Sequence, residues 1–206
     1  MYSVLCGRRE ALRRAAILRV ARDIFSEVGY AATSMAQIAA KLGGSKATLY
    51  KYFPSKQELF AASLEDLISD HASDMLPPVP SDDTLEKSVS GLCRKLTSAM
   101  LSPPLIALFR LVIAESPRFP ELGQAYYGKV VLPGTERLSA FLQQCMDRQL
   151  IRVADPMIAA QQLAALCRTS LHFKALANVE SASSPAAIEA EADAAAATFL
   201  AAYRLE

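Results

Sequence analysis

The spacing of apolar residues in the first part of the chain is that of a helix. Over residues 8–28, apolar side chains recur at i, i+4, i+7, i+8 and i+11, which places them on one helical face. These residues are Ile17, Ala21, Ile24, Phe25 and Val28. Gly29 follows the last of them and is expected to end the helix, because glycine enters the left-handed region without a Cβ penalty.

The same pattern predicts shorter helices directly afterwards. Thr33 stands at the position of an N-cap, ahead of an apolar pattern that the pair Gly43-Gly44 interrupts. Ser45 is placed to cap the next helix, residues 46–53, which ends before a proline. Ser55 opens the sequence Ser-Lys-Gln-Glu, which is a capping box and predicts the start of a long helix.

Prolines and polar clusters divide the remainder of the chain into further helices. The proline at position 133 is expected to kink or split one of them. The expected segments are 85–100, 105–115, one containing Tyr126 and Tyr127, 135–150, 156–177 and 186–204. No alternating pattern typical of a strand persists in the sequence. The chain is therefore predicted to be all-α, with about nine helices.

The composition agrees with a folded helical protein and excludes other classes. The chain has 206 residues, of which 52% are apolar and 21% charged, so it can bury a core. No stretch approaches the roughly 18 uninterrupted apolar residues of a membrane-spanning helix. At the start, the basic cluster follows the apolar residues, which is not the order of a secretory signal. We expect a cytoplasmic protein with no membrane partner.

Cysteine and histidine are too scattered to indicate a metal site. The four cysteines form no Cys-x-x-Cys pair and the two histidines lie far apart; these residues are Cys6, Cys93, Cys145, Cys167, His71 and His172. Cys145 and Cys167 are either redox sensors or inert core thiols, and their apolar neighbours favour the second interpretation. No catalytic sequence motif is present, so we expect neither an enzyme nor a cofactor.

Charge is distributed unevenly along the chain. Residues 1–56 carry ten Lys and Arg but three Asp and Glu, a net charge of +7, whereas the remainder carries −6. A basic segment of this kind either meets a polyanion or is a solvated helix face. The charge alone does not distinguish these two interpretations, so the fold predicted for the segment has to be considered as well.

Such a fold is indicated by the two short helices and the glycine turn between them. An α-helix about 10–12 Å across fits the major groove of B-DNA, roughly 12 Å wide. Its first turn then carries short hydrogen-bonding side chains near the bases, while longer groups reach phosphates. Leu49 and Phe53, four residues apart, are expected to anchor this helix to the core. Tyr50, Lys51 and Tyr52 would then face solvent or DNA.

The motif resembles that of a known family. The run from Thr33 to Phe60, together with Ile24-Phe25 and Gly29-Tyr30, resembles the N-terminal signature of tetracycline-repressor (TetR/AcrR) family transcriptional regulators. The resemblance covers about residues 10–60. It implies a DNA-binding domain, residues 1–56, and a helical effector-binding and dimerisation domain, residues 57–206.

The resemblance also implies roles for individual residues. Thr33 would cap the second helix and touch phosphate, and Ser45, Lys46, Ala47 and Thr48 would present the recognition helix to bases and backbone. Phosphate contacts are implied for Tyr50, Tyr52 and Lys56, with Lys51 on the same exposed side. Other interpretations stay open, because Ser45 is sufficient as a cap, Tyr52 as a packing residue and Lys56 as a surface charge.

The chain departs from the family pattern at Gly44. The family usually has a β-branched apolar residue there, which helps to pack the turn. A looser turn or a re-aimed recognition helix is therefore one expectation. The alternative function, a helical small-molecule-binding protein that has lost DNA recognition, depends on this one feature.

The second part of the chain resembles the family less specifically. The segment from Phe109 to Leu122 is similar to the C-terminal domain of one branch of the family. The resemblance implies a homodimer formed by the last two long helices. Small residues on these helices allow close approach in a four-helix bundle; they are Ala159, Ala160, Ala164, Ala165, Ala190, Ala194, Ala197 and Ala201.

No clear constellation marks the effector pocket. Arg168 and His172, four residues apart on one predicted helix, either meet a polar or anionic ligand or lie at a surface or interface. The full set of candidate effector contacts is Phe109, Arg110, Tyr126, Tyr127, Cys145, Arg168, His172 and Phe173. The sequence as a whole predicts a homodimeric regulator, most often a repressor in this family, that binds a palindromic operator in double-stranded DNA and is released by a small-molecule effector.

Overall fold

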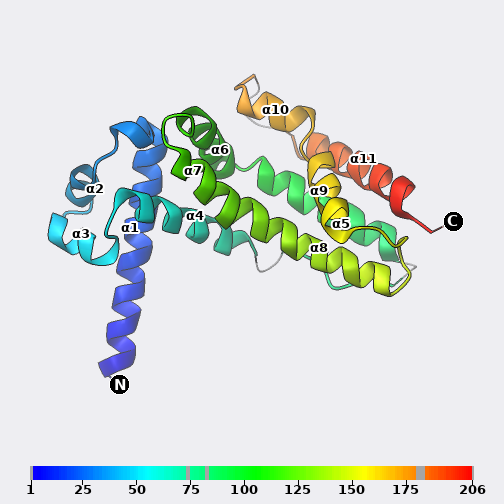
Figure 1. Cartoon of the computed structure of the whole chain (residues 1–206), viewed down its shortest axis with the longest axis horizontal. Helices are drawn as coiled ribbons and strands as arrows, with labels where there is room; N and C mark the ends of the chain where they lie inside the picture. Colours follow the sequence, from blue (N-terminus) through cyan, green and yellow to red (C-terminus); the bar gives the residue numbers. More distant parts are fainter. Residues whose placement is uncertain (1, 73–74, 82–83, 180–183, 206) are drawn as a thin grey trace. The chain divides into compact units, whose positions relative to one another are not determined.

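All regular structure in the described part of the chain is helical, which confirms the predicted fold class (Figure 1). The computed structural model describes residues 2–72, 75–81, 84–179 and 184–205. No single helix among these residues is both long and apolar enough to cross a membrane. Helices α5 (Leu85–Met100) and α6 (Pro103–Glu115), which bend by 60° relative to each other, reach the necessary length and apolarity only when they are taken together.

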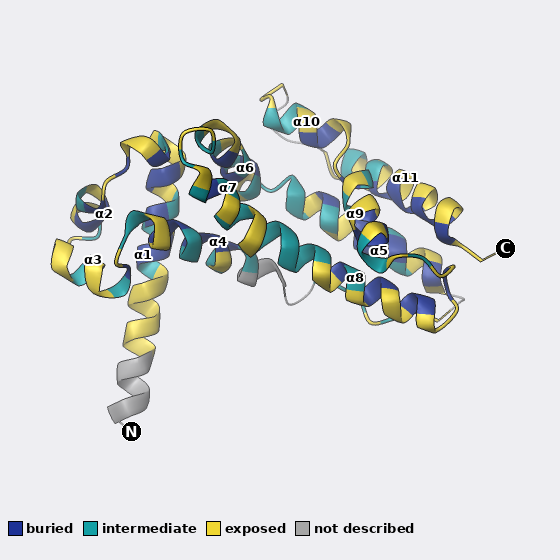
Figure 2. Ribbon diagram, viewed as in Figure 1, coloured by how far each residue is buried: buried dark blue, intermediate teal, exposed yellow. Residues whose placement is uncertain are grey.

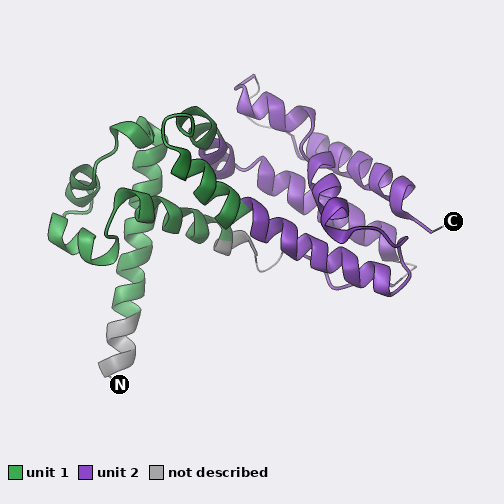
Figure 3. Ribbon diagram, viewed as in Figure 1, with its two compact units in different colours: residues 1–70, 110–130 green, residues 71–109, 131–206 purple. Residues whose placement is uncertain are grey.

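The chain forms two compact units (Figure 3). Unit 1 consists of residues 1–70 and 110–130, and unit 2 of residues 71–109 and 131–206. The helices of unit 1 are α1 (Tyr2–Ala32), α2 (Met35–Lys41), α3 (Lys46–Tyr52), most of α4 (Lys56–Ala72), the end of α6 (Pro103–Glu115), α7 (Pro120–Tyr126) and most of the π-helical segment η2 (Tyr127–Val131). A segment from the middle of the chain therefore belongs to the same body as its first helices.

Aromatic rings form the centre of unit 1. Phe25, Tyr30 and Phe60 contact one another with ring centroids 5.5–5.6 Å apart, in stacked and edge-to-face arrangements. Phe119 adds a further edge contact to Tyr30 at 5.2 Å. Such pairs each contribute about 0.5–1.5 kcal/mol beyond the area that they bury. The cluster thus joins α1, α4 and the segment leading into α7.

The predicted stop at Gly29 is confirmed as a break inside α1. Gly29 has φ 83° and ψ 167°, a conformation outside the helix that L-residues rarely adopt. A Cβ atom at this position would also lie 2.9 Å from Oε1 of Glu115. Glycine is required here both by the backbone and by the close approach of α6.

The two glycines of the turn between α2 and α3 differ in what the backbone requires. Gly43 has φ 64°, and the amides of Gly43 and Gly44 donate to the carbonyls of Ala40 and Ala39 at 3.0 and 3.1 Å. This is the hydrogen-bonding pattern of a Schellman stop. Gly44 has no positive φ, and a Cβ there would meet only the Arg13 guanidinium, at 3.5 Å. The turn is closed by these hydrogen bonds, and position 44 has room for a Cβ atom.

Unit 2 is a bundle around a separate core. Its helices are α5 (Leu85–Met100), the start of α6, α8 (Leu132–Asp147), α9 (Pro156–Leu166), α10 (Ser170–Leu176) and α11 (Pro185–Tyr203). Helix α11 packs on α5, and α8 packs on α9. Figure 2 shows the buried residues lining the facing sides of these helices. Pro133 lies in the first turn of α8, directly after η2, where its missing N–H costs little.

The prediction of a single helix over residues 156–177 is wrong, because the helix is interrupted at Thr169. Thr169 has φ −101° and ψ −139°, and it separates α9 from α10. Glu191 of α11 accepts hydrogen bonds from the Thr169 hydroxyl and from the Leu171 amide. A carboxylate from another helix therefore satisfies the start of α10, which a local sequence pattern cannot indicate.

The turn predicts opposite effects for neighbouring glycine substitutions. Gly44→Ala is expected to raise the free energy of unfolding by about 0.4–1 kcal/mol, because the unfolded chain loses freedom and the Cβ has room. Gly43→Ala is expected to lower it by about 1–2 kcal/mol, because an L-residue is strained at positive φ. Urea unfolding measures both values. Equal effects of the two substitutions would contradict the described turn.

Candidate nucleic-acid interface

Ser45 caps helix α3, as the sequence predicts. Its Oγ accepts the Thr48 amide at 3.1 Å and lies 2.9 Å from the Thr48 hydroxyl. The Ser45 side chain is exposed and that of Thr48 is half-buried. Capping satisfies one of the amides left free at a helix start. The two hydroxyls thus fix the beginning of α3 and remain accessible from outside.

Helix α3 has one apolar face and one polar face. Leu49 and Phe53 are buried, with 2% and 3% exposure, as their spacing predicts. Lys46, Ala47 and Lys51 are exposed, and Tyr50 is 46% exposed. Tyr52 is half-buried. The buried residues attach α3 to the rest of unit 1, so its opposite side presents amines and a phenol to solvent.

The prediction that Thr33 caps α2 is wrong, because the next residue makes the cap. Ser34 Oγ accepts the Gln37 amide at 3.2 Å, and Gln37 Oε1 accepts the Ser34 amide at 2.7 Å. Thr33 is 2% exposed, and its hydroxyl donates to the Gly29 carbonyl at 2.7 Å. The reciprocal Ser-x-x-Gln pattern is a capping box and would have identified Ser34 from the sequence.

Lys56 is engaged within the protein. Its Nζ donates to the carbonyls of Tyr30 and Thr33 at 2.8 and 2.9 Å and lies 4.2 Å from the centre of the Tyr30 ring. Burial lowers the pKa of Lys56, while the carboxylates of Glu115 and Glu121 act in the opposite direction. The ammonium therefore ties the end of α1 to the start of α4. Its sequence position, in the first turn of a helix, gave no indication of these partners.

Glu115 completes this corner and was not among the sequence candidates. Its Oε1 accepts the Ala31 amide at 3.2 Å, across 84 residues of chain. Ser55 accepts the Glu58 amide at 3.1 Å, as the predicted capping box requires, and the Glu58 carboxylate accepts from the Ser55 hydroxyl at 3.1 Å, where a full capping box has it accept from the Ser55 backbone amide. No local pattern indicates the Glu115 contact, because its partner lies in a distant segment.

The predicted effector residues fall into both compact units. Arg110, Tyr126 and Tyr127 belong to unit 1; Phe109, Cys145, Arg168, His172 and Phe173 belong to unit 2. In unit 2 the Phe109 and His172 rings lie 5.8 Å apart, and those of His172 and Phe173 lie 6.4 Å apart. The prediction that Arg168 and His172 share one helical face is wrong, because the break at Thr169 separates the two residues.

His172 is the least satisfied of these side chains. It is 8% exposed, and its Nδ1 has no hydrogen-bond partner among the described residues. Burial, followed by the Arg168 guanidinium, lowers the pKa of His172, while a hydrogen bond to the Met100 backbone acts in the opposite direction. The imidazole is therefore neutral near pH 7, and Nδ1 is available as a buried acceptor.

The described cysteines lie in the core of unit 2. Cys93, Cys145 and Cys167 are free and buried. Burial raises the pKa of Cys145 to about 11. A hydrogen bond from the Cys93 thiol to Cys167 raises the pKa of the first and lowers that of the second. No group of three potential metal ligands occurs among the described residues, and the side chains of Cys6 and His71 lie outside them.

A groove of about 430 Å³ runs between α9 and α11 of unit 2. Its lining is mostly apolar and includes Gln162, Ala165, Leu166, Thr198, Phe199 and Ala202. Tyr203 at its end donates a hydrogen bond to Gln162. On the same helix, Ala190, Ala194, Ala197 and Ala201 are exposed. These two helices thus present a surface of small side chains with a shallow apolar groove.

Comparisons with known proteins match both parts of the chain. Residues 17–63 match the model of bacterial regulatory proteins of the tetR family, and residues 87–205 match that of the AefR-like transcriptional repressor C-terminal domain. The HTH-type transcriptional regulator RutR of Escherichia coli strain K12 is 41% identical over 62 residues, which cover 30% of this chain and 29% of RutR.

Two solved structures resemble nearly the whole chain. The flavonoid-responsive regulator FrrA is 34% identical with a TM-score of 0.78, and the match covers 93% of this chain and 97% of FrrA. A TetR family transcriptional regulator from Pseudomonas syringae pv. tomato DC3000 is 27% identical with a TM-score of 0.71, over 95% and 98% of the two chains.

The contacts of Lys56 predict a loss of stability when its charge is removed. Lys56→Met keeps the aliphatic stem but leaves two carbonyls without a charged donor, so the free energy of unfolding is expected to fall by about 1.5–3 kcal/mol. Lys51→Met, at an exposed position of α3, is the matched control and is expected to change it by less than about 0.5 kcal/mol. Chemical denaturation distinguishes the two. A Lys56→Met protein as stable as the control would refute the assigned role.

Proposed function

The chain belongs to the TetR family of transcriptional regulators, and from this premise we propose that it is a homodimeric repressor released from its operator by a small molecule. The observation that carries the DNA-binding part is the two-faced helix α3. Its apolar residues are buried and its amines, phenol and hydroxyls are outside. A helix of this kind is suited to lie in the major groove.

Within α3 we assign different tasks to different side chains. Ser45, Ala47 and Thr48 lie at the first turn, where short side chains can approach base edges. Lys46, Tyr50, Lys51 and Tyr52 reach further and are assigned to phosphates and neighbouring bases. Thr33 and Lys56 are assigned to the scaffold instead, since their polar groups are paired with backbone carbonyls.

The proposed dimer uses α9 and α11. Two-fold DNA binding needs two recognition helices about 34–36 Å apart, or a multiple of that spacing, so one chain is not enough. The exposed alanines of α11 allow a helix of a second copy to approach closely, and the groove between α9 and α11 offers apolar area to be covered. Both features favour these helices as the interface.

The proposed effector contacts in unit 2 centre on His172. A ligand donor group that pairs with its buried Nδ1 would remove the cost of leaving that atom unsatisfied. The rings of Phe109 and Phe173 flank the imidazole, so an aromatic or apolar body next to that donor fits the surroundings. Release of DNA requires that this ligand bind the DNA-competent and released states with different affinities.

The DNA-binding proposal predicts that the outward residues of α3 matter more than other surface cations. Lys46→Ala and Tyr50→Ala are each expected to weaken binding to an operator, selected by the wild-type chain from a randomised duplex library, by about 1–3 kcal/mol without loss of helix content. Lys87→Ala, an exposed position on α5, serves as control. A gel-shift titration in which all variants match the wild type would remove α3 from the interface.

The dimer proposal predicts a position-dependent effect of a new charge. Ala194→Glu, on the exposed side of α11, is expected to convert the dimer to monomer at micromolar concentration, because a carboxylate would be buried without a partner. Ala140→Glu, on the exposed side of α8, is expected to leave the dimer intact. Sedimentation velocity measures both. Dimers of equal stability for the two variants would place the interface elsewhere.

A further inference from the structure

The first helix contains an exposed basic segment that the roles assigned above do not use. From Arg8 to Ala15 all eight residues of α1 are exposed, and burial begins further along with Ile17 and Leu18 (Figure 2). Four of the eight are arginines and one, Glu10, is acidic. This part of α1 buries no side chain on its own protein, so hydrophobic contact does not explain its composition.

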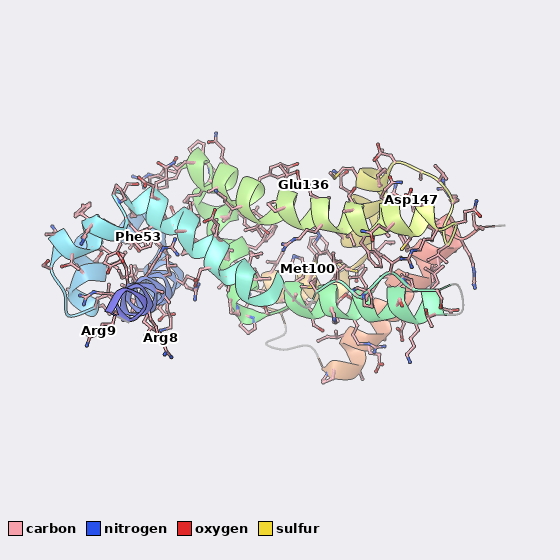
Figure 4. All side chains as sticks on the ribbon, turned by 90° about the horizontal axis from the view of Figure 1, so that it is seen from below. Arg8, Arg9, Phe53, Met100, Glu136 and Asp147 are labelled. Carbon is pink, nitrogen blue, oxygen red and sulfur yellow. The ribbon has the colours of Figure 1, made fainter. Side chains whose placement is uncertain are left out.

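The basic segment lies directly beside the recognition helix. Arg13 Nη2 lies 3.5 Å from the position of a Cβ at Gly44, in the turn before α3. The Arg14 guanidinium lies 5.3 Å from the centre of the Phe53 ring, at the other end of α3. Arg13 and Arg14 therefore lie close to the two ends of α3, and α1 continues past them (Figures 1 and 4).

Charge within this segment is not neutralised by the protein. No carboxylate among the described residues forms an ion pair with Arg8, Arg9 or Arg13. Arg9 and Arg13 are one helical turn apart, so their like charges face the same side and repel each other. Arg8 and Arg9 are labelled at the end of α1 in Figure 4. An extended polyanion placed along this side would relieve the repulsion.

We propose that Arg8, Arg9 and Arg13 form a second DNA-contact surface, which binds phosphates flanking the bases that α3 reads. The inference rests on the proposed DNA-binding function. The partner is the phosphodiester backbone of the same duplex, because Arg13 lies beside the turn that precedes the helix assigned to the major groove, and Arg8 and Arg9 lie further along the same exposed part of α1. Guanidinium groups match phosphate geometry with paired hydrogen bonds, and contacts to phosphate carry no direct sequence information. The surface therefore adds affinity and salt dependence without changing the sequence that is recognised.

The test combines protein variants with duplexes of two lengths. The full chain first enriches an operator from a randomised duplex library. Binding is then measured by fluorescence anisotropy over a range of salt, with the operator carrying about ten flanking base pairs on each side or trimmed to the enriched sequence. The test variant is Arg8→Ala, Arg9→Ala, Arg13→Ala. The control variant, Lys87→Ala, Arg148→Ala, Arg204→Ala, removes the same charge from exposed positions of unit 2.

The expected result separates the two variants. Each lost phosphate contact is expected to reduce the slope of log affinity against log salt by about 0.9. The test variant should therefore show a shallower slope, gain nothing from the long flanks and enrich the same bases as the wild type. The control variant should keep the wild-type slope and flank effect. Alanine is the best helix former and these positions touch no core residue, so helix content should be unchanged.

Other outcomes overturn the proposal in distinguishable ways. A test variant with the wild-type slope and the wild-type advantage of long flanks would refute the arginine surface alone. A test variant that enriches different bases would show that these arginines read sequence instead of phosphate. A wild-type chain that enriches no sequence would overturn the proposed function, and the arginine surface with it.

Discussion

The DNA-reading unit depends on one ammonium group held against two backbone carbonyls. The break of α1 at Gly29 interrupts the helix just before two backbone carbonyls, those of Tyr30 and Thr33, of which the first also accepts the Thr33 amide at 3.3 Å. Lys56 donates to both, and Glu115 accepts the Ala31 amide on the other side of the same corner. Charge-assisted hydrogen bonds are about twice as strong as neutral ones. The direction in which α2 leaves this corner, and therefore the placement of α3, is fixed by groups from α4 and α6.

This corner also explains why unit 1 includes a segment from the middle of the chain. Residues 110–130 come from the middle of the chain, but Glu115 and Phe119 from that segment contact the Gly29–Thr33 corner directly. A change in the position of α6 would therefore act on the same hydrogen bonds that orient α2. The body that presents α3 is larger than the helix-turn-helix motif, because it includes residues 110–130 from the middle of the chain.

The sequence was sufficient where local spacing determines structure. The cap at Ser45, the buried pair Leu49 and Phe53 and the break at Gly29 all follow from residues within one or two helical turns. The prediction was wrong where two neighbouring hydroxyl residues were candidates for the N-cap of α2, since Ser34 has the Gln37 partner that Thr33 lacks. The prediction was also wrong where a distant carboxylate takes part, because Glu191 accepts hydrogen bonds from Thr169 and Leu171 at the break in the helix predicted to continue through Thr169. The chemistry of a side chain indicates which ligand groups it can bind, but it does not determine which segments come together in the fold.

Groove chemistry gives the most direct measurement of the central claim, that α3 enters the major groove twice per assembly. Guanine N7 faces that groove, so protein bound there protects it from methylation by dimethyl sulfate. On a duplex enriched by this chain, the account predicts two clusters of protected guanines separated by one helical turn, about 10–10.5 base pairs, or a multiple of it. Protection confined to the minor-groove edge of adenines, or a single cluster, would contradict it.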